Sequence, residues 1–296
     1  MNFITKFSKA RNLPPSFTET AANYYMPLLE EVVKRKGSKT FVLGINGAQG
    51  SGKSTLAEFL ATAALELRGW AVTCISLDDI YHTKAARLKL AHEMHPLMET
   101  RGVPGTHDVD LGAEVLTKLR DLKHGETVAV PRFDKAIDDQ LPKSEWSLAE
   151  GPQNLIIFEG WCMGCLAQSE GELLEPVNEL EAQEDPDGIW RRSVNQSLLD
   201  YNDRLWSQLD VMSMLQVPSF EQVYLWRTEQ ENKLVKSLGY ATELSDPIKM
   251  RRFISHYERL TRHMLKNLGS NVDILMKLNQ DHQVYSIFPD ALTKSN

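Results

Sequence analysis

Residues 47–54 read Gly47-Ala48-Gln49-Gly50-Ser51-Gly52-Lys53-Ser54, a match to the pattern G-x-x-x-x-G-K-[ST], and Thr55 follows them. The apolar run 41–45 before this stretch has the character of a buried strand. An apolar-periodic helix after it runs to Arg68 and stops at Gly69. Glycines let successive backbone N–H groups turn toward one point, where they bind phosphate oxygens at a helix N-terminus. The sequence therefore predicts a strand, a phosphate-binding loop and a helix.

Two side chains of this loop indicate what it binds. Lys53 is expected to neutralise the β- and γ-phosphates of a nucleoside triphosphate, and Ser54 to offer its hydroxyl to Mg²⁺. Residues 47–55 are thus the predicted nucleotide-binding segment. The guanine-reading pattern N-K-x-D of GTPases is missing, since the nearest string, residues 279–281, reads Asn-Gln-Asp.

Length and composition set limits on the class of protein. The 296 residues are 42% hydrophobic and 25% charged, enough for one large α/β domain or two small ones. No signal peptide is visible and no apolar run approaches the roughly 20 residues of a membrane span, so we expect a cytoplasmic protein with no membrane partner. Three cysteines fit a reducing compartment. The net charge of −7 argues against nucleic acid as the main partner, so local cations must hold any phosphate.

The rest of the chain indicates a parallel sheet. Further strands are predicted at 71–77, 154–158 and 209–217, and strands separated by helices favour the α/β class. Helices are predicted at 21–36, 110–124, 219–238 and 246–268, and a hairpin at 272–287. Residues 83–109 have an irregular or partly helical pattern. We therefore predict an N-terminal helical extension over residues 1–39 and a phosphate-binding domain over 40–296.

Three acids stand at the ends of predicted strands. Asp78 and Asp79 follow the strand 71–77, and Glu159 follows the strand 154–158. Open α/β sheets build their sites at this edge. A small-molecule kinase needs one carboxylate that accepts the proton of the substrate hydroxyl and another that holds Mg²⁺. The alternative for the two aspartates is that they only cap the next helix.

Other polar segments are candidates for an acceptor site and a lid. The loop 102–108 ends in His107 and Asp108, and residues 131–135 place Arg132 and Lys135 beside an acid, which would suit an anionic acceptor. The helix 246–268 is basic, and with Arg227 on the preceding helix it would form a lid over the transferring phosphoryl group. The alternatives are ordinary loop hydrogen bonds, a surface salt-bridge cluster and solvated helix faces.

Two further signals are given structural interpretations. The acid-rich stretch 170–188 contains almost no cation and is interpreted as a solvated surface segment. Cys162 and Cys165 form a C-x-x-C pair without a second cysteine pair, so we predict neither a redox nor a zinc role for them.

The motifs resemble those of the D-glycerate 3-kinase family of plants and its fungal and bacterial relatives, within the phosphoribulokinase, uridine kinase and pantothenate kinase group of P-loop kinases. The likeness spans about residues 20–290, and it rests on 47–54, on Ser-Leu-Asp-Asp-Ile-Tyr at 76–81, on Arg-Gly-Val-Pro-Gly-Thr-His-Asp at 101–108, on Phe-Asp-Lys at 133–135, on Phe-Glu-Gly-Trp at 158–161 and on Trp-Arg-Thr-Glu-Gln at 226–230.

The resemblance implies a P-loop fold with a helical lid at about 219–268, and ATP as the nucleotide. By resemblance, Asp78 is the catalytic acid, Glu159 the metal-side acid and Arg227 a lid arginine. With Lys53 these make up the predicted catalytic residues, and the predicted Mg²⁺ ligands are Ser54, Asp78 and Glu159. The residues predicted to bind the acceptor are Asp79, Tyr81, Arg101, His107, Asp108, Arg132 and Lys135.

The expected activity is phosphoryl transfer from ATP to D-glycerate, giving 3-phosphoglycerate. The chain departs from the plant pattern after Lys135, where residues 136–142 replace a glycine- and arginine-rich segment, so other small acceptors stay open: pantothenate, a nucleoside or a sugar phosphate. A nucleotide-binding regulator without catalysis is the alternative from another class. The sequence leaves the oligomeric state open.

Overall fold

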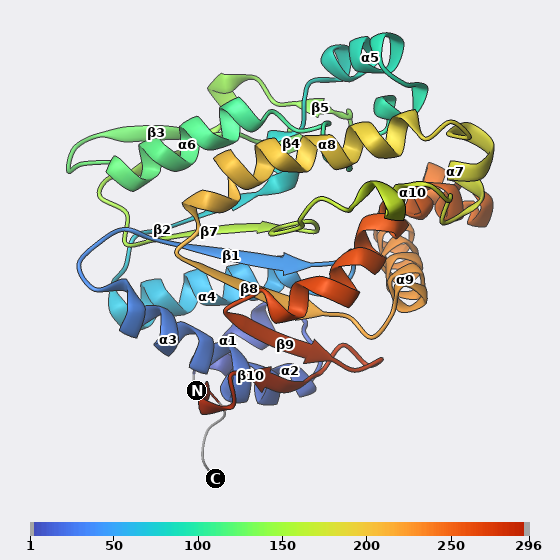
Figure 1. Cartoon of the computed structure of the whole chain (residues 1–296). Helices are drawn as coiled ribbons and strands as arrows, with labels where there is room; N and C mark the ends of the chain where they lie inside the picture. Colours follow the sequence, from blue (N-terminus) through green and yellow to red (C-terminus); the bar gives the residue numbers. More distant parts are fainter. Residues whose placement is uncertain (1–2, 293–296) are drawn as a thin grey trace.

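A computed structural model describes residues 3–292 and has a six-stranded sheet at its centre (Figure 1). The strand order is β10-β9-β8-β1-β7-β2, and every neighbouring pair is parallel except β9 and β10. The strands are β1 (Phe41–Gly47), β2 (Val72–Ser76), β7 (Leu155–Gly160), β8 (Val211–Gln216), β9 (Ile274–Leu278) and β10 (Val284–Phe288). The predicted α/β class, the parallel sheet and the C-terminal hairpin are therefore confirmed.

Helices cover both faces of the sheet, because its central strands are apolar on both sides. In β1, Val42 belongs to one hydrophobic core, while Leu43 and Ile45 belong to the other. The first core is closed by α6 (Val109–Asp121), α8 (Ile189–Arg204) and α10 (Pro247–Asn267). The second is closed by α1 (Phe3–Ala10), α2 (Ser16–Thr20), a π-helical turn (Ala21–Tyr25), α3 (Met26–Lys36) and α4 (Lys53–Arg68).

The N-terminal helices pack directly on the helix that follows the phosphate-binding loop. Phe7 and Phe17 contact the ring of Phe59 in α4 edge-on, with centroids 5.2 and 5.8 Å apart. The predicted helix at 21–36 is present as the π-helical turn and α3. The division of the chain at residue 39 stays a prediction.

Smaller elements complete the fold. The helices α5 (Lys84–Glu93), α7 (Glu179–Glu184) and α9 (Phe220–Leu238) lie toward the right and top of Figure 1. The strands β3 (Thr127–Val130) and β6 (Ser147–Glu150) form one ribbon, and β4 (Phe133–Asp134) and β5 (Asp139–Gln140) another. The 3-10 turns are η2 (Leu77–Ile80), η3 (Pro96–Glu99), η4 (Lys143–Glu145), η5 (Glu170–Leu173), η6 (Trp206–Gln208), η7 (Glu243–Ser245), η8 (Leu268–Ser270) and η9 (Asp290–Leu292). The helix predicted to reach residue 124 ends at Asp121.

The interpretation of residues 170–188 as a solvated segment is wrong for two of its acids. Glu181 and Asp185 are each 1% exposed. Arg259 of α10 pairs with Glu181 at 2.6 Å, and Arg191 of α8 pairs with Asp185 at 3.0 Å. The cations that neutralise the stretch come from helices elsewhere in the chain. Arg259 is itself buried, so the alternative of a solvated helix face does not hold for this residue. Among residues 3–292, no helix combines the length and apolar character that crossing a membrane requires.

Candidate active site

The phosphate-binding loop joins β1 to α4, as predicted. Gly50 and Gly52 have φ angles of 78° and 89°, in the left-handed region that favours glycine. A Cβ at Gly47 would collide with the side-chain oxygen of Ser51. The glycines of the motif are thus needed for the backbone path that presents successive N–H groups at the start of α4.

Ser54 and Glu159 meet beside this loop. Glu159 stands opposite Ile45 in the parallel pairing of β7 with β1, and its Oε1 accepts a hydrogen bond of 2.8 Å from Ser54 Oγ. The residue is 6% exposed, and its Oε2 has no hydrogen-bond partner among residues 3–292. A buried carboxylate oxygen without a partner is costly unless a cation faces it. A hydroxyl and a carboxylate are ligands that Mg²⁺ prefers, so these two residues fit the predicted metal.

Asp78 lies in η2, directly after β2 on the next strand of the sheet. Its Oδ1 accepts a hydrogen bond of 2.8 Å from the hydroxyl of Tyr81, and its Oδ2 one of 2.6 Å from Lys135 Nζ. Burial acts to raise the pKa of this carboxyl, but the ammonium groups of Lys135 and Lys53 outweigh it and hold the pKa well below the usual range. Asp78 is therefore ionised, and its negative charge is stabilised in part by Lys53 of the phosphate-binding loop.

Asp79 has different contacts from its neighbour. Its carboxylate accepts hydrogen bonds from the backbone N–H of Ser76 and of Phe133, and it pairs with Arg132 at 2.8 Å. Burial raises its pKa against the effect of that arginine. Helix capping, the alternative weighed for both aspartates, thus describes Asp79. An acceptor-binding role for Asp79 and Arg132 stays a prediction.

The ring of Tyr81 is fixed from two sides. His107 stacks on it with centroids 4.4 Å apart, and Phe133 meets it edge-on at 5.2 Å. His107 Nδ1 lies 2.7 Å from the hydroxyl of Tyr201, which also accepts a hydrogen bond from Gly105 N–H. Burial lowers the pKa of His107 to about 3, so the imidazole is neutral. Tyr201 was not predicted, because nothing in the sequence of α8 distinguishes it from a core tyrosine.

The two ends of the segment 101–108 are held by the surrounding elements. Asp108 accepts a hydrogen bond of 2.9 Å from Leu111 N–H and so caps α6. Arg101 pairs with Asp138, and its carbonyl accepts a hydrogen bond of 3.2 Å from Tyr257 of α10. A Cβ at Gly102 would collide with the same tyrosine. The helix α10 therefore packs directly on the loop, and its role as a lid and the acceptor contacts of Arg101 and Asp108 stay predictions.

Arg227 lies in α9 next to the phosphate-binding loop. A Cβ at Gly50 would stand 2.8 Å from the Cβ of Trp226, so the loop and the N-terminal half of α9 are in close contact. Arg227 Nη1 pairs with Glu231 at 2.7 Å, one turn further along the helix, and both side chains are largely buried. The structure brings Arg227 to the loop, and its action on a phosphoryl group stays a prediction.

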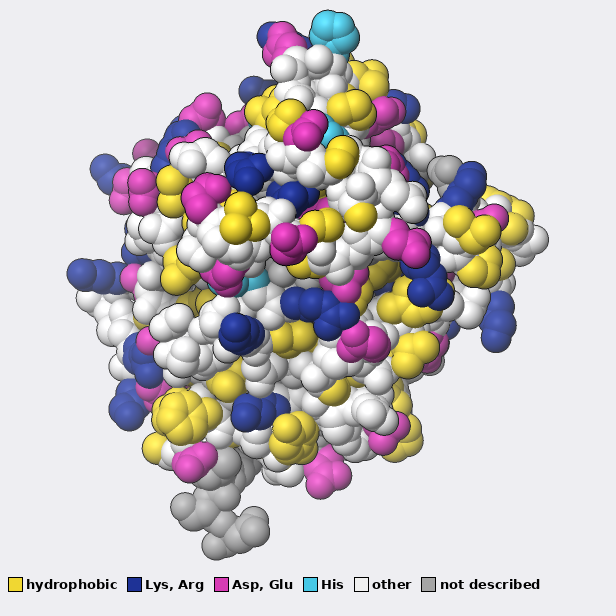
Figure 2. Space-filling view, turned by 45° about the vertical axis from the view of Figure 1, so that its right-hand side comes forward, with side chains coloured by type: hydrophobic (Ala, Val, Ile, Leu, Met, Phe, Trp, Pro, Cys, Tyr) yellow, Lys and Arg dark blue, Asp and Glu magenta, His cyan; other side chains and the backbone are white. Residues whose placement is uncertain are grey.

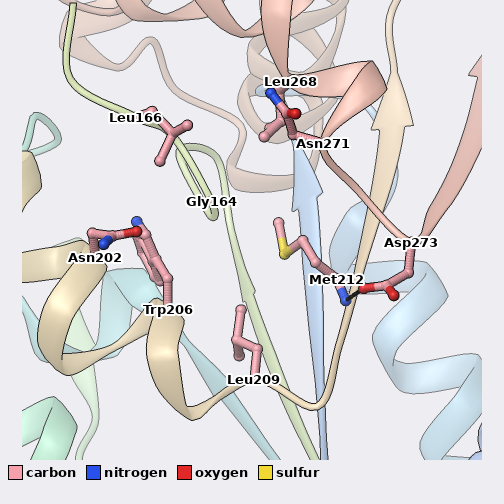
Figure 3. Close-up of a pocket in the computed structure, with 9 residues that line it drawn as sticks. All are labelled: Gly164, Leu166, Asn202, Trp206, Leu209, Met212, Leu268, Asn271 and Asp273. Atoms are coloured by element: carbon pink, nitrogen blue, oxygen red, sulfur yellow. Dashed lines mark hydrogen bonds between the residues drawn. The ribbon is translucent and has the colours of Figure 1, made fainter.

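The surface away from these residues has mixed charge and contains a pocket. On the face seen in Figure 2, Lys and Arg side chains alternate with Asp and Glu, in keeping with the net charge of −7. A pocket of about 200 Å³ opens beside the start of β8, and its lining includes none of the predicted site residues (Figure 3). It is lined by Gly164, Leu166, Asn202, Trp206, Leu209, Met212, Leu268, Asn271 and Asp273.

The chain is similar to several curated kinases. It is 32% identical over 251 residues to an uncharacterized kinase of Schizosaccharomyces pombe, covering 82% of this chain and 87% of that protein. It is 27% identical over 292 residues to a probable ATP-dependent kinase of Saccharomyces cerevisiae, covering 91% and 96%. It is 28% identical over 286 residues to the chloroplastic D-glycerate 3-kinase of Arabidopsis thaliana, covering 88% of this chain and 59% of the plant protein.

Solved structures agree on the fold. A D-glycerate 3-kinase from Cryptococcus neoformans superposes with a TM-score of 0.74 at 24% identity, covering 89% of this chain and 96% of that one. No protein-family model matches. A uridine kinase of Macrococcus caseolyticus is 31% identical over 128 residues, covering 42% of this chain and 53% of that protein. The chain thus belongs to the glycerate kinase-like family of P-loop kinases, which is related to the uridine kinases.

Proposed function

We propose that this protein transfers the γ-phosphoryl group of ATP to a hydroxyl of D-glycerate, giving 3-phosphoglycerate. One observation carries the proposal. The phosphate-binding loop, Glu159 and Asp78 stand at the carboxyl ends of three adjacent strands, β1, β7 and β2. Phosphoryl transfer is mainly a matter of positioning and of electrostatic stabilisation, and this arrangement offers both.

Each of these groups has a role in the proposal. Lys53 and the N–H groups of the loop bind the phosphates of ATP. Ser54 and Glu159 would hold Mg²⁺, with Asp78 as a further oxygen donor. When bound, this ion neutralises charge on the β- and γ-phosphates. Arg227, beside Gly50, would stabilise the charge of the transferring group.

The transfer itself needs one proton acceptor. A bond forms between the acceptor hydroxyl oxygen and the γ-phosphorus, and the bond from that phosphorus to the β–γ bridging oxygen breaks. ADP leaves with the electron pair, and the hydroxyl proton passes to the carboxylate of Asp78. Arg101, His107, Arg132 and Lys135 would form the acceptor side, and three of them are cations suited to the carboxylate of D-glycerate.

The experiment is a comparison of acceptors. We would measure ADP release from ATP and Mg²⁺ with D-glycerate, L-glycerate, pantothenate, uridine, ribulose 5-phosphate or no acceptor. Strong stimulation by D-glycerate alone is expected. Stimulation by another acceptor would keep the kinase and discard D-glycerate. ATP binding without stimulation by any acceptor would favour the regulator.

A further inference from the structure

Lys135 forms an ion pair with Asp78, the carboxylate that accepts the hydroxyl proton in the proposed reaction. It lies in the turn between β4 and β5, and its Nζ donates to Asp78 Oδ2 at 2.6 Å. Tyr81 donates to the other oxygen at 2.8 Å. Each oxygen of Asp78 therefore already accepts one hydrogen bond within the chain, and a substrate hydroxyl has to approach the carboxylate beside one of these two donors.

The two partners of Asp78 differ in how firmly they are held. Tyr81 is 3% exposed, and its ring is fixed between His107 and Phe133. The side chain of Lys135 is 61% exposed. The ammonium group of Lys135 reaches solvent on a flexible four-carbon stem, so it can turn toward another anion without being buried itself. Lys135 is thus the partner that can be displaced.

The neighbouring pair offers a contrast within the same structure. The carboxylate of Asp79, whose side chain is 16% exposed, accepts two backbone hydrogen bonds besides its pair with Arg132. Arg132, with its side chain 37% exposed, is thus paired with a carboxylate that the backbone holds in place, while Lys135, at 61%, is the more solvated of the two cations.

We propose that the acceptor's own negative charge draws Lys135 away from Asp78, so that the carboxylate is released toward the hydroxyl only when an anionic acceptor is bound. This inference rests on the proposed function and narrows the acceptor to short hydroxy acids and similar anions. Lys135 Nζ and Asp78 Oδ2 are adjacent, so a molecule whose hydroxyl and anionic group are a few bonds apart engages both. In D-glycerate the reacting hydroxyl and the carboxylate are separated by two carbon atoms.

The same contact protects ATP from water. Without an acceptor, the ammonium group of Lys135 stays on Oδ2 of Asp78, where it competes with a water molecule beside the γ-phosphate for the carboxylate that would orient it. With an anionic acceptor, the acceptor hydroxyl takes the position that Lys135 leaves. The hydroxyl proton then passes to Asp78 while the γ-phosphoryl group passes to the acceptor oxygen and ADP departs.

The first test uses Lys135→Met. We expect D-glycerate-dependent turnover to fall about tenfold or more, while acceptor-free hydrolysis of ATP to ADP and phosphate rises several-fold. The matched control is Lys118→Met, because Lys118 is similarly exposed at 58% and pairs with Glu114 at 2.5 Å on the surface of α6. It should change neither rate.

The second test uses the wild-type protein and so does not depend on a variant's folding. D-lactate carries the carboxylate of D-glycerate but lacks the hydroxyl that would be phosphorylated. It should raise phosphate release from ATP several-fold, and the uncharged methyl ester of D-lactate should not. Equal effects of the acid and the ester, or no effect of either at concentrations that compete with D-glycerate, would overturn the inference.

The outcomes separate the two proposals. If no acceptor in the comparison stimulates the wild-type protein, the proposed function fails. If D-glycerate stimulates it but Lys135→Met lowers both rates together, or leaves both unchanged, with ATP affinity as in the wild type, only the release of Asp78 by the acceptor is wrong. A fall in D-glycerate-dependent turnover together with a rise in acceptor-free hydrolysis supports it, and the reverse contradicts it.

Discussion

Ser54 Oγ donates a hydrogen bond of 2.8 Å to Glu159 Oε1, and this contact joins the first turn of α4 to the end of β7. The second oxygen of Glu159 is buried without a partner among residues 3–292. A carboxylate that offers one free oxygen beside a phosphate-binding loop is suited to bind a cation. The relationship depends on the parallel pairing of β7 with β1, which sets Glu159 opposite Ile45.

Glu159→Gln should therefore act mainly on the metal. The amide can still accept the hydrogen bond from Ser54, but it carries no charge, so we expect turnover to fall about 100-fold or more and the Mg²⁺ concentration for half-maximal rate to rise. ADP release measured against Mg²⁺ concentration checks this. Glu150→Gln, an exposed acid at the end of β6, is the control. An unchanged Mg²⁺ requirement would place the ion elsewhere.

Asp78→Asn should act on the chemical step. The substitution keeps the size of the side chain but removes the charge that receives the hydroxyl proton, so we expect kcat to fall by about 10²–10⁴ while ATP affinity stays near the wild-type value. Steady-state kinetics and titration with ATP measure the two quantities. Turnover equal to that of the wild type would remove Asp78 from the mechanism.

Much of this site follows from local patterns. The phosphate-binding loop, the strands that end at Asp78 and Glu159, and the helices after them were predicted because apolar period and glycine spacing are properties of a few consecutive residues. The acids that end these hydrophobic runs were also predicted to lie at one edge of the sheet, because the carboxyl ends of parallel strands share an edge.

The remaining contacts join residues that are far apart in the chain. Tyr201 reaches His107 across 94 positions, and Tyr257 reaches Arg101 across 156. Each tyrosine lies on an apolar helix face, where it has the pattern of an ordinary core residue. The burial of Glu181 likewise depends on Arg259, 78 positions away. Such pairs depend on how the helices pack against each other. Runs of charge and apolar periodicity are local properties and do not predict this packing.

The pairing of Arg227 with Glu231 allows its catalytic and structural roles to be separated. Arg227→Met leaves the buried carboxylate of Glu231 without its cation and with the hydroxyl of Thr242 as a remaining donor, so we expect a loss of stability of about 3 kcal/mol together with a large loss of turnover. Adding Glu231→Gln removes the unpaired charge and should restore most of the stability but not the turnover. Urea unfolding and ADP release test this. Recovery of both would assign Arg227 a structural role only.

His256 should make stability depend on pH. It is buried beside Trp190, and burial lowers its pKa to about 4 from the ordinary value of about 6.5. The unfolded chain therefore binds a proton below pH 6.5 that the folded chain does not, so stability is present above this pH and is lost as pH falls toward 4. Between pH 7 and pH 5 this amounts to about 2 kcal/mol. The free energy of unfolding of His256→Leu should fall correspondingly less, and parallel curves would contradict the assignment.

Removing Arg259 from its buried pair with Glu181 should lower the free energy of unfolding far more than removing the arginine of an exposed pair between the same two helices. Their side chains are 6% and 1% exposed, and the guanidinium also donates to the carbonyls of Glu172 and Glu175. Arg259→Met leaves both carbonyls without this donor and the buried carboxylate without its cation, with the N–H of Val177 as a remaining donor, so we expect the free energy of unfolding in urea to fall by about 3–5 kcal/mol.

The matched control for this last prediction is Arg252→Met. Arg252 also lies in α10 and pairs with Glu184 of α7 at 2.6 Å, but the two side chains are 48% and 40% exposed. Solvent screens such a pair, and its loss should cost at most about 1 kcal/mol. Because both pairs connect the same elements, the difference between the variants measures burial and not the joining of α7 to α10. Equal losses would mean that water reaches Glu181, in contradiction to its burial.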